Sequence, residues 1–101
     1  MPLLHVAFQE GFSADEVVVA VNGKQVFRRA GITTKTQIGY ADSFDLEVPS
    51  GELRLDAQVA TRKLATSKAI RVVDRLYVGI SLDRPGESLT FEIADEPFGY
   101  L

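Results

Sequence analysis

The sequence predicts an all-β fold, a small antiparallel β-sandwich, and two observations lead to this prediction. Apolar and polar residues alternate along several short stretches, which is the pattern of strands that bury one face. Glycines and turn-forming pairs separate these stretches at the spacing of a chain of short strands. Eight or nine strands in 101 residues are immunoglobulin-like in size and strand count, and two packed sheets would bury their apolar faces. A small closed β-barrel is the alternative architecture.

The alternation is carried by several stretches in which every second side chain is apolar. The expected inward rows are Leu4, Val6 and Phe8; Phe44, Leu46 and Val48; Leu53, Leu55, Ala57 and Val59; Leu76, Val78, Ile80 and Leu82; and Leu89, Phe91 and Ile93. One further stretch, 17–21, is apolar at every position and rich in valine, which predicts a strand covered on both faces.

Turn signals lie between these stretches. The strongest is Asn22-Gly23, because both residues tolerate positive φ, as a type I′ hairpin turn between 17–21 and 25–29 requires. Residues 84–87 have proline second and glycine third, which predicts a type II turn. Residues 49–51 predict a further turn.

The segment 57–70 can be interpreted in two ways, because it is rich in residues that also favour helices. A helix would align only Ala57, Ala60 and Leu64 along one face, which is too narrow a stripe to pack well. We therefore predict a long hairpin in which residues 61–66 form the loop.

Composition excludes several classes of site. The chain has no cysteine and one histidine, so it can form no disulfide, thiolate zinc site or iron–sulfur cluster and has no cysteine nucleophile. We expect no cofactor and no metal centre. The length predicts a single domain over residues 1–101.

The beginning of the chain shows no basic segment followed by a long apolar run, so no signal peptide is predicted. No apolar stretch approaches the roughly 18 residues that a membrane span needs. Together with the lack of cysteine, these features favour a cytoplasmic location without deciding it.

Charge is unevenly distributed along the chain. The net charge of −3 argues against nucleic acid as a partner. Residues 1–23 carry three acids and no lysine or arginine, residues 24–75 carry ten bases and six acids, and residues 76–101 carry one base and five acids. The middle of the chain is therefore basic and both ends are acidic.

The basic character is most concentrated in the 61–75 hairpin, where Asp74 is the single acid. Its bases are Arg62, Lys63, Lys68, Arg71 and Arg75. This density predicts a binding site for a small anion or an acidic partner. The stretch lacks the interleaved aromatic residues that single-stranded nucleic acid favours. Lysine on an exposed edge strand also has a plainer use, which is to block aggregation between edges.

The chain ends in three large apolar side chains, Phe98, Tyr100 and Leu101. They could fold back over an open end of the sandwich. They could instead dock on another protein or on a second copy of the chain, and we take them as a candidate interface.

Motifs for catalysis are missing. His5 is out of phase with the apolar row around it and is expected on the outer face, and no G-x-S-x-G elbow or phosphate-binding glycine loop occurs. Asp45 and Glu47 share a strand face that is expected to be solvated. Acids near strand ends, such as Asp42 with Asp45 and the pair 15–16, leave a calcium site as an alternative.

These observations predict a non-catalytic binding or assembly module that acts through sheet edges, the C-terminal aromatic tail or the basic 61–75 hairpin. Another protein or a second copy of the chain is the expected partner. A domain that binds a small anion or calcium is the alternative. An enzyme without a recognisable motif is the second alternative.

Overall fold

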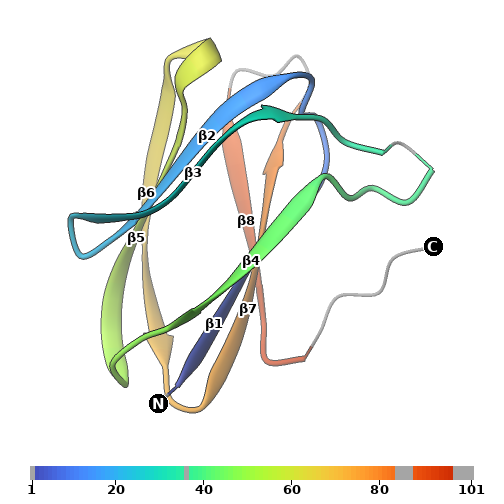
Figure 1. Ribbon diagram of the computed structural model, residues 1–101. Coiled ribbons are helices and arrows are strands. Elements are labelled where there is room, and N and C mark those ends of the chain that lie inside the picture. The colour runs from blue at the N-terminus through green and yellow to red at the C-terminus, as the bar shows by residue number, and fades with distance from the viewer. Residues whose placement is uncertain (1, 36, 84–87, 97–101) are drawn as a thin grey trace.

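The computed structural model describes residues 2–35, 37–83 and 88–96 and contains two four-stranded sheets packed face to face (Figure 1). This confirms the predicted sandwich and its strand number. The strands are β1 Leu3–Phe8, β2 Asp15–Val21, β3 Lys24–Ile32, β4 Asp42–Glu47, β5 Gly51–Val59, β6 Leu64–Val72, β7 Arg75–Leu82 and β8 Leu89–Ala94. A single 3-10 turn, η1, spans Ala60–Arg62. No helix in this part of the chain is long and apolar enough to cross a bilayer.

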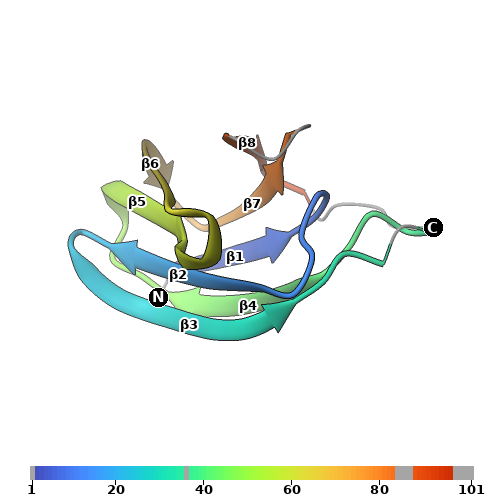
Figure 2. The same cartoon turned by 90° about the horizontal axis from the view of Figure 1, so that it is seen from above.

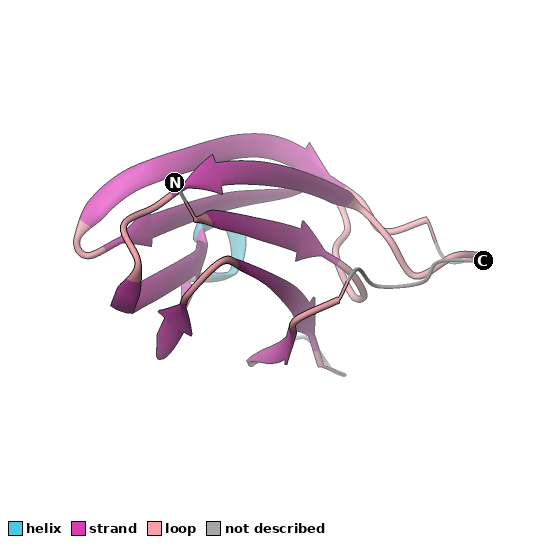
Figure 3. Ribbon diagram, turned by 90° about the horizontal axis from the view of Figure 1, so that it is seen from below, coloured by secondary structure: helices cyan, strands magenta, loops and turns pink. Residues whose placement is uncertain are grey.

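The strand order is β4-β1-β7-β8 in one sheet and β3-β2-β5-β6 in the other. Neighbouring strands are antiparallel with one exception, because β1 pairs in parallel with β7, from Leu3 opposite Arg75 to Phe8 opposite Ile80. The strands form two layers (Figure 3). The chain passes repeatedly between these layers, so β1 and β7 meet in the centre of their sheet although they are far apart in the sequence (Figure 2).

The core lies between the two inner faces and is built from the predicted apolar rows. The rows of β1 and β5 are fully buried, and the inward side chains of β7 are buried from Val78 onward. The prediction that β2 is covered on both faces is wrong. Val17, Val19 and Val21 are buried, but Val18 and Ala20 on the outer face are only half-buried, because no third layer covers them in the described part of the chain.

The hairpin turns follow the local sequence. Asn22 and Gly23 have φ angles of 51° and 82°, as a type I′ turn requires. The segment 57–70 is a hairpin and not a helix, although its loop is shorter than predicted, because β6 already begins at Leu64. The predicted turn at 84–87 lies outside the described residues.

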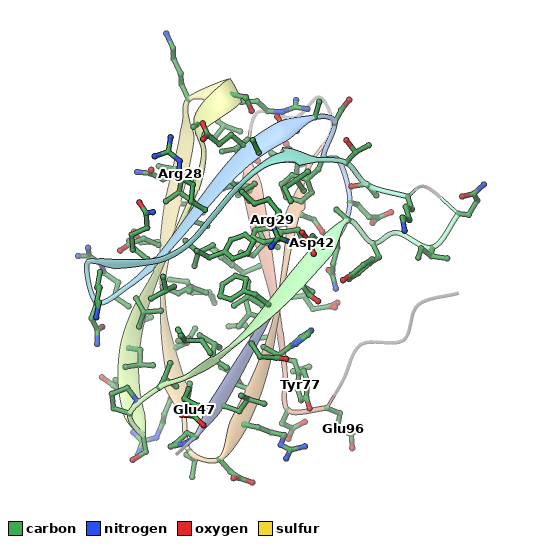
Figure 4. The ribbon with its side chains drawn as sticks, viewed as in Figure 1. Arg28, Arg29, Asp42, Glu47, Tyr77 and Glu96 are labelled. Atoms are coloured by element: carbon green, nitrogen blue, oxygen red, sulfur yellow. The ribbon has the colours of Figure 1, made fainter. Side chains whose placement is uncertain are left out.

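One side of the sandwich is closed by side chains from β3 and β4. The rings of Phe27 and Phe44 stack with centroids 4.2 Å apart. Arg29 lies over the Phe27 ring at 5.2 Å and donates a hydrogen bond to the Asp42 carboxylate (Figure 4). On the opposite side, β6 and β8 are the two sheet edges and lie apart from β3 and β4 (Figure 2).

Candidate interaction surface

The structure does not gather the five predicted basic residues into one cluster. Arg62 belongs to η1, and Lys63 follows it at the tip of the β5–β6 hairpin. Lys68 and Arg71 are three residues apart on β6 and therefore project from opposite faces of the strand. Arg75 begins β7, which belongs to the other sheet.

Arg62 is engaged in an ion pair with Asp15, which is 2% exposed. Its Nε donates to Asp15 Oδ1 at 3.0 Å, and its Nη2 donates to Oδ2 at 3.2 Å. The Thr61 hydroxyl donates to Oδ1 at 2.6 Å, and the backbone N–H of Ser13 donates to Oδ2 at 2.8 Å. These bonds attach the tip of the hairpin to the start of β2, so Arg62 has a structural partner within the fold.

The charge state of Asp15 follows from these contacts. Burial alone would raise the pKa of its carboxyl, since it removes water from the charged form. The hydrogen bonds from Arg62, Ser13 and Thr61 outweigh burial and hold the pKa below the ordinary value of 3.8. The same pair raises the pKa of Arg62 through its hydrogen bond to Asp15. Both groups are therefore charged at neutral pH.

Asp15 was not anticipated as the partner of Arg62, although the sequence contains a signal for it. Asp15 is in phase with the apolar row of Val17, Val19 and Val21. An acid in such a row points into the core and needs a cation or several donors to compensate for burial. The signal identifies a buried acid but not the residue that pairs with it.

The most distinctive surface of the molecule is the free edge of β6. Nine consecutive residue pairs join β6 to β5, from Gly51 opposite Val72 to Val59 opposite Leu64, without a register shift. No strand pairs with the other side of β6 in the part of the chain that the structure describes. It therefore presents a long and regular row of backbone donors and acceptors.

The other three edges are less suited to pairing. The register of β3 against β2 shifts at two places, and its side chains are tied to β4. β4 and β8 are six residues long, against nine for β6. Length and regularity therefore distinguish β6 among the four edges.

The side chains of β6 leave its backbone accessible. Ala65, Ser67 and Ala69 belong to its outer row, which ends at Arg71, and these three residues are exposed and small. Lys68 lies on the same face as the buried Ile70 but is itself exposed at the edge. A charge on the inner face of an edge strand hinders pairing with another edge unless that edge carries the opposite charge.

A shallow hollow of about 420 Å³ adjoins β6 on the outer face of its sheet. Val18 and Ala20 line it, together with the polar side chains of Arg54 and Asp56. The Asp56 carboxylate accepts hydrogen bonds from the Ser67 hydroxyl and from Arg54. The bond from Ser67, followed by the bond and charge of Arg54, lowers the pKa of Asp56. The lining of the hollow therefore combines small apolar side chains with an ion pair.

A larger hollow of about 700 Å³ lies at the ends of β7 and β8, and Glu10, Asp83 and Glu92 are among its lining residues. Asp83 accepts hydrogen bonds from the backbone N–H and the hydroxyl of Ser88. Among the described residues, no three histidine, aspartate or glutamate side chains lie close enough together to hold a metal ion.

The acids considered for calcium have other partners. Asp15 binds Arg62, Asp42 binds Arg29, and Asp45 lies beside His5. His5 Nδ1 is 2.6 Å from Asp45 Oδ1, on the outer face of the β4-β1-β7-β8 sheet. Such a pair fixes the orientation of the imidazole ring. No serine or threonine hydroxyl in the described residues is hydrogen-bonded to this histidine.

The remaining predicted site residues, Phe98, Tyr100 and Leu101, lie outside the described residues, so their role as an interface stays a prediction. Comparisons with protein-family models, curated proteins and solved structures found no match to this chain.

Proposed function

We propose that this domain is a non-catalytic binding module that takes up an extended, acidic protein segment along β6. The observation that carries the proposal is the nine-residue edge of β6, whose pairing to β5 is free of register shifts. A strand that adds to such an edge satisfies backbone donors and acceptors along its whole length. The immunoglobulin-like size and strand count agree with a domain that acts by presenting its surface.

Charge selects the kind of segment that would bind. Lys68 on the inner side and Arg71 on the outer side flank the β6 backbone, and Lys63 immediately precedes its first residue. An acidic strand would place carboxylates beside these cations, whereas a basic strand would meet like charges. The basic residues therefore favour an acidic partner over a basic one.

The shape of the surface around the β6 edge also favours binding of an extended segment. The exposed row of Ala65, Ser67 and Ala69 lets a neighbouring strand approach the edge closely. The hollow that Val18 and Ala20 line lies on the same face. Ala65 and Ser67 line the side of this hollow that lies next to an added strand, so a side chain of that strand can pack against two small residues there.

Amide chemical shifts of the full chain test this proposal. The probes are two heptapeptides, one alternating glutamate with valine and one alternating lysine with valine. We expect the acidic peptide to shift the amides of β6 and of its partner β5, and the basic peptide to shift none. Replacing both cations, by Lys68→Glu with Arg71→Glu, is expected to weaken binding about tenfold or more, since two attractive contacts become repulsive.

A matched variant controls for net charge. Lys24→Glu with Lys35→Glu makes the same change in charge at exposed residues away from β6, so we expect it to bind the acidic peptide like the parent chain. Shifts outside β5 and β6, or equal binding of both peptides, would exclude the β6 edge as the site. Shifts at Lys63, Lys68 and Arg71 with inorganic phosphate, but with neither peptide, would favour a small-anion site instead.

A further inference from the structure

We infer that the acidic segment is β8 of a second copy of this chain, so that two copies join through reciprocal β6–β8 pairing. This inference rests on the proposed function of β6, since it names the partner of that edge. Charge, geometry and exposed apolar surface support it independently of one another.

The two edges carry opposite charge. From Lys63 to Arg71 the chain has three bases and no acid. From 88 to 96 it has three acids, Glu92, Asp95 and Glu96, and no base. Pairing β6 with β6 of another copy, or β8 with β8, would oppose like charges along the edges. Pairing β6 with β8 brings opposite charges together.

The geometry allows both edges to pair at once. β6 and β8 lie on the same side of the sandwich, one in each sheet (Figure 2, Figure 3), and their Cα atoms approach within 8 Å. They also run in the same direction (Figure 1). A twofold axis parallel to the strands on this side exchanges the two layers. It therefore places β6 beside β8 of the second copy and β8 beside that copy's β6, as parallel neighbours.

Such a dimer is closed. Both free edges on this side are used, so the contact does not propagate into a filament. The opposite side is not available for the same contact, because Phe27, Phe44 and the Arg29–Asp42 pair join β3 to β4 there. Each sheet of one copy would continue into a sheet of the other.

Exposed apolar side chains lie at this side. Among the described residues, two large hydrophobic side chains are exposed, Val73 at 71% and Ile93 at 38%. Val73 directly follows β6, and Ile93 belongs to β8. Ile93 is in the inward row of its strand but remains uncovered at the edge. A strand added beside β8 covers it, which removes apolar surface from water.

The alternation of side chains also matches across the two copies. Arg71 projects from the outer face of its sheet, and Glu92, opposite Gly79, projects from the outer face of the other sheet. The twofold axis makes these two outer faces parts of one continuous surface. Arg71 of one copy and Glu92 of the second copy then lie on the same face of one continuous sheet.

Sedimentation velocity of the full chain at low salt, from micromolar concentration to about 1 mM, tests the inference in the range of weak to moderate association. We expect the mass to rise with concentration toward twice 11.1 kDa. Arg71→Glu alone and Glu92→Arg alone are each expected to raise the dissociation constant about tenfold or more, because each reversal acts twice in a twofold dimer.

Two combinations of these substitutions make the test specific to reciprocal pairing. A chain with both Arg71→Glu and Glu92→Arg should dimerise again. An equal mixture of the two single variants should also dimerise, because each of its two seams again joins opposite charges. Lys24→Glu is the control and should dimerise like the parent chain. A dimer that none of the β6 and β8 changes affects would show that another surface associates, and would overturn the inference.

Sedimentation velocity and the peptide titration together distinguish the β8 partner from the proposed function of β6. A chain that stays monomeric at about 1 mM while its β6 amides still respond to the acidic peptide would refute the β8 partner and leave the proposed function standing. A monomer whose β6 amides respond to no peptide would refute both.

Discussion

Replacing Arg62 by methionine is the most informative test of how the hairpin tip is held. Arg62→Met keeps the length of the side-chain stem and removes both guanidinium donors to Asp15. The Asp15 side chain is 3% exposed, and the Arg62 side chain is 29% exposed. The carboxylate would keep the hydrogen bonds from Ser13 and Thr61 but lose both bonds from the guanidinium.

The expected loss of unfolding free energy follows from how deeply Asp15 and Arg62 are buried. Removing one partner of a fully buried ion pair costs about 3–5 kcal/mol. Here the guanidinium is partly exposed and two neutral donors remain, so we expect a loss of about 2–4 kcal/mol in unfolding free energy at pH 7. For a domain of this size, this corresponds to a fall in Tm of roughly 10–25 °C.

The stability difference between the parent chain and Arg62→Met should also depend on pH, in a direction that the pKa of Asp15 determines. In the parent chain the folded-state pKa of Asp15 lies below the ordinary 3.8, so the pair adds stability above that value. This stability is lost as pH falls through the folded-state pKa. In Arg62→Met, burial is no longer outweighed by the guanidinium, so the pKa of Asp15 should rise and its protonation should favour the folded form. The stability difference between the two chains should therefore shrink from pH 7 to about pH 3.

Urea unfolding followed by circular dichroism at both pH values measures these differences. Lys63→Met is the matched control, since Lys63 is the adjacent exposed cation of the same loop, and we expect it to change stability by less than about 0.5 kcal/mol. A loss below about 1 kcal/mol for Arg62→Met at pH 7, or an equal loss at both pH values, would refute the reasoning.

Two further predictions concern the framework that carries the β6 edge. Gly11→Ala should lower Tm much more than Gly23→Ala, because both residues have positive φ but a Cβ at Gly11 would lie 2.5 Å from the Leu82 carbonyl oxygen, while the Gly23 site is open. Equal losses in differential scanning calorimetry would show that backbone strain alone matters. Phe44→Ala should cost about 2–4 kcal/mol in urea unfolding, because it removes the ring that stacks on Phe27 and closes the β3–β4 side. Hydrogen exchange should then accelerate at β3 and β4 more than at β6, and uniform acceleration would contradict a local role for the stack.

Much of the strand framework could be predicted because the information is local. Alternation with a period of two depends only on neighbouring residues, so the buried rows of β1, β5 and β7 could be recognised from the sequence. The turn at Asn22-Gly23 is equally local, since it depends on the φ preferences of two residues. The same local pattern placed Asp15 in a buried row, although its consequence was not recognised.

The candidate surface depends on tertiary contacts that local sequence patterns do not specify. Alternation says which face of a strand is apolar, but not which strand becomes its neighbour or in which direction it runs. The parallel pairing of β1 with β7 and the bond between Asp15 and Arg62, 47 residues apart, both arise from packing between distant segments. Packing also decided that Lys68 and Arg71 flank an edge that no other described strand pairs with, while Arg62 is held by an acid from another strand. The sequence by itself therefore determined the strands and their buried faces, and the tertiary structure alone decided which edges and charges remain available to a partner.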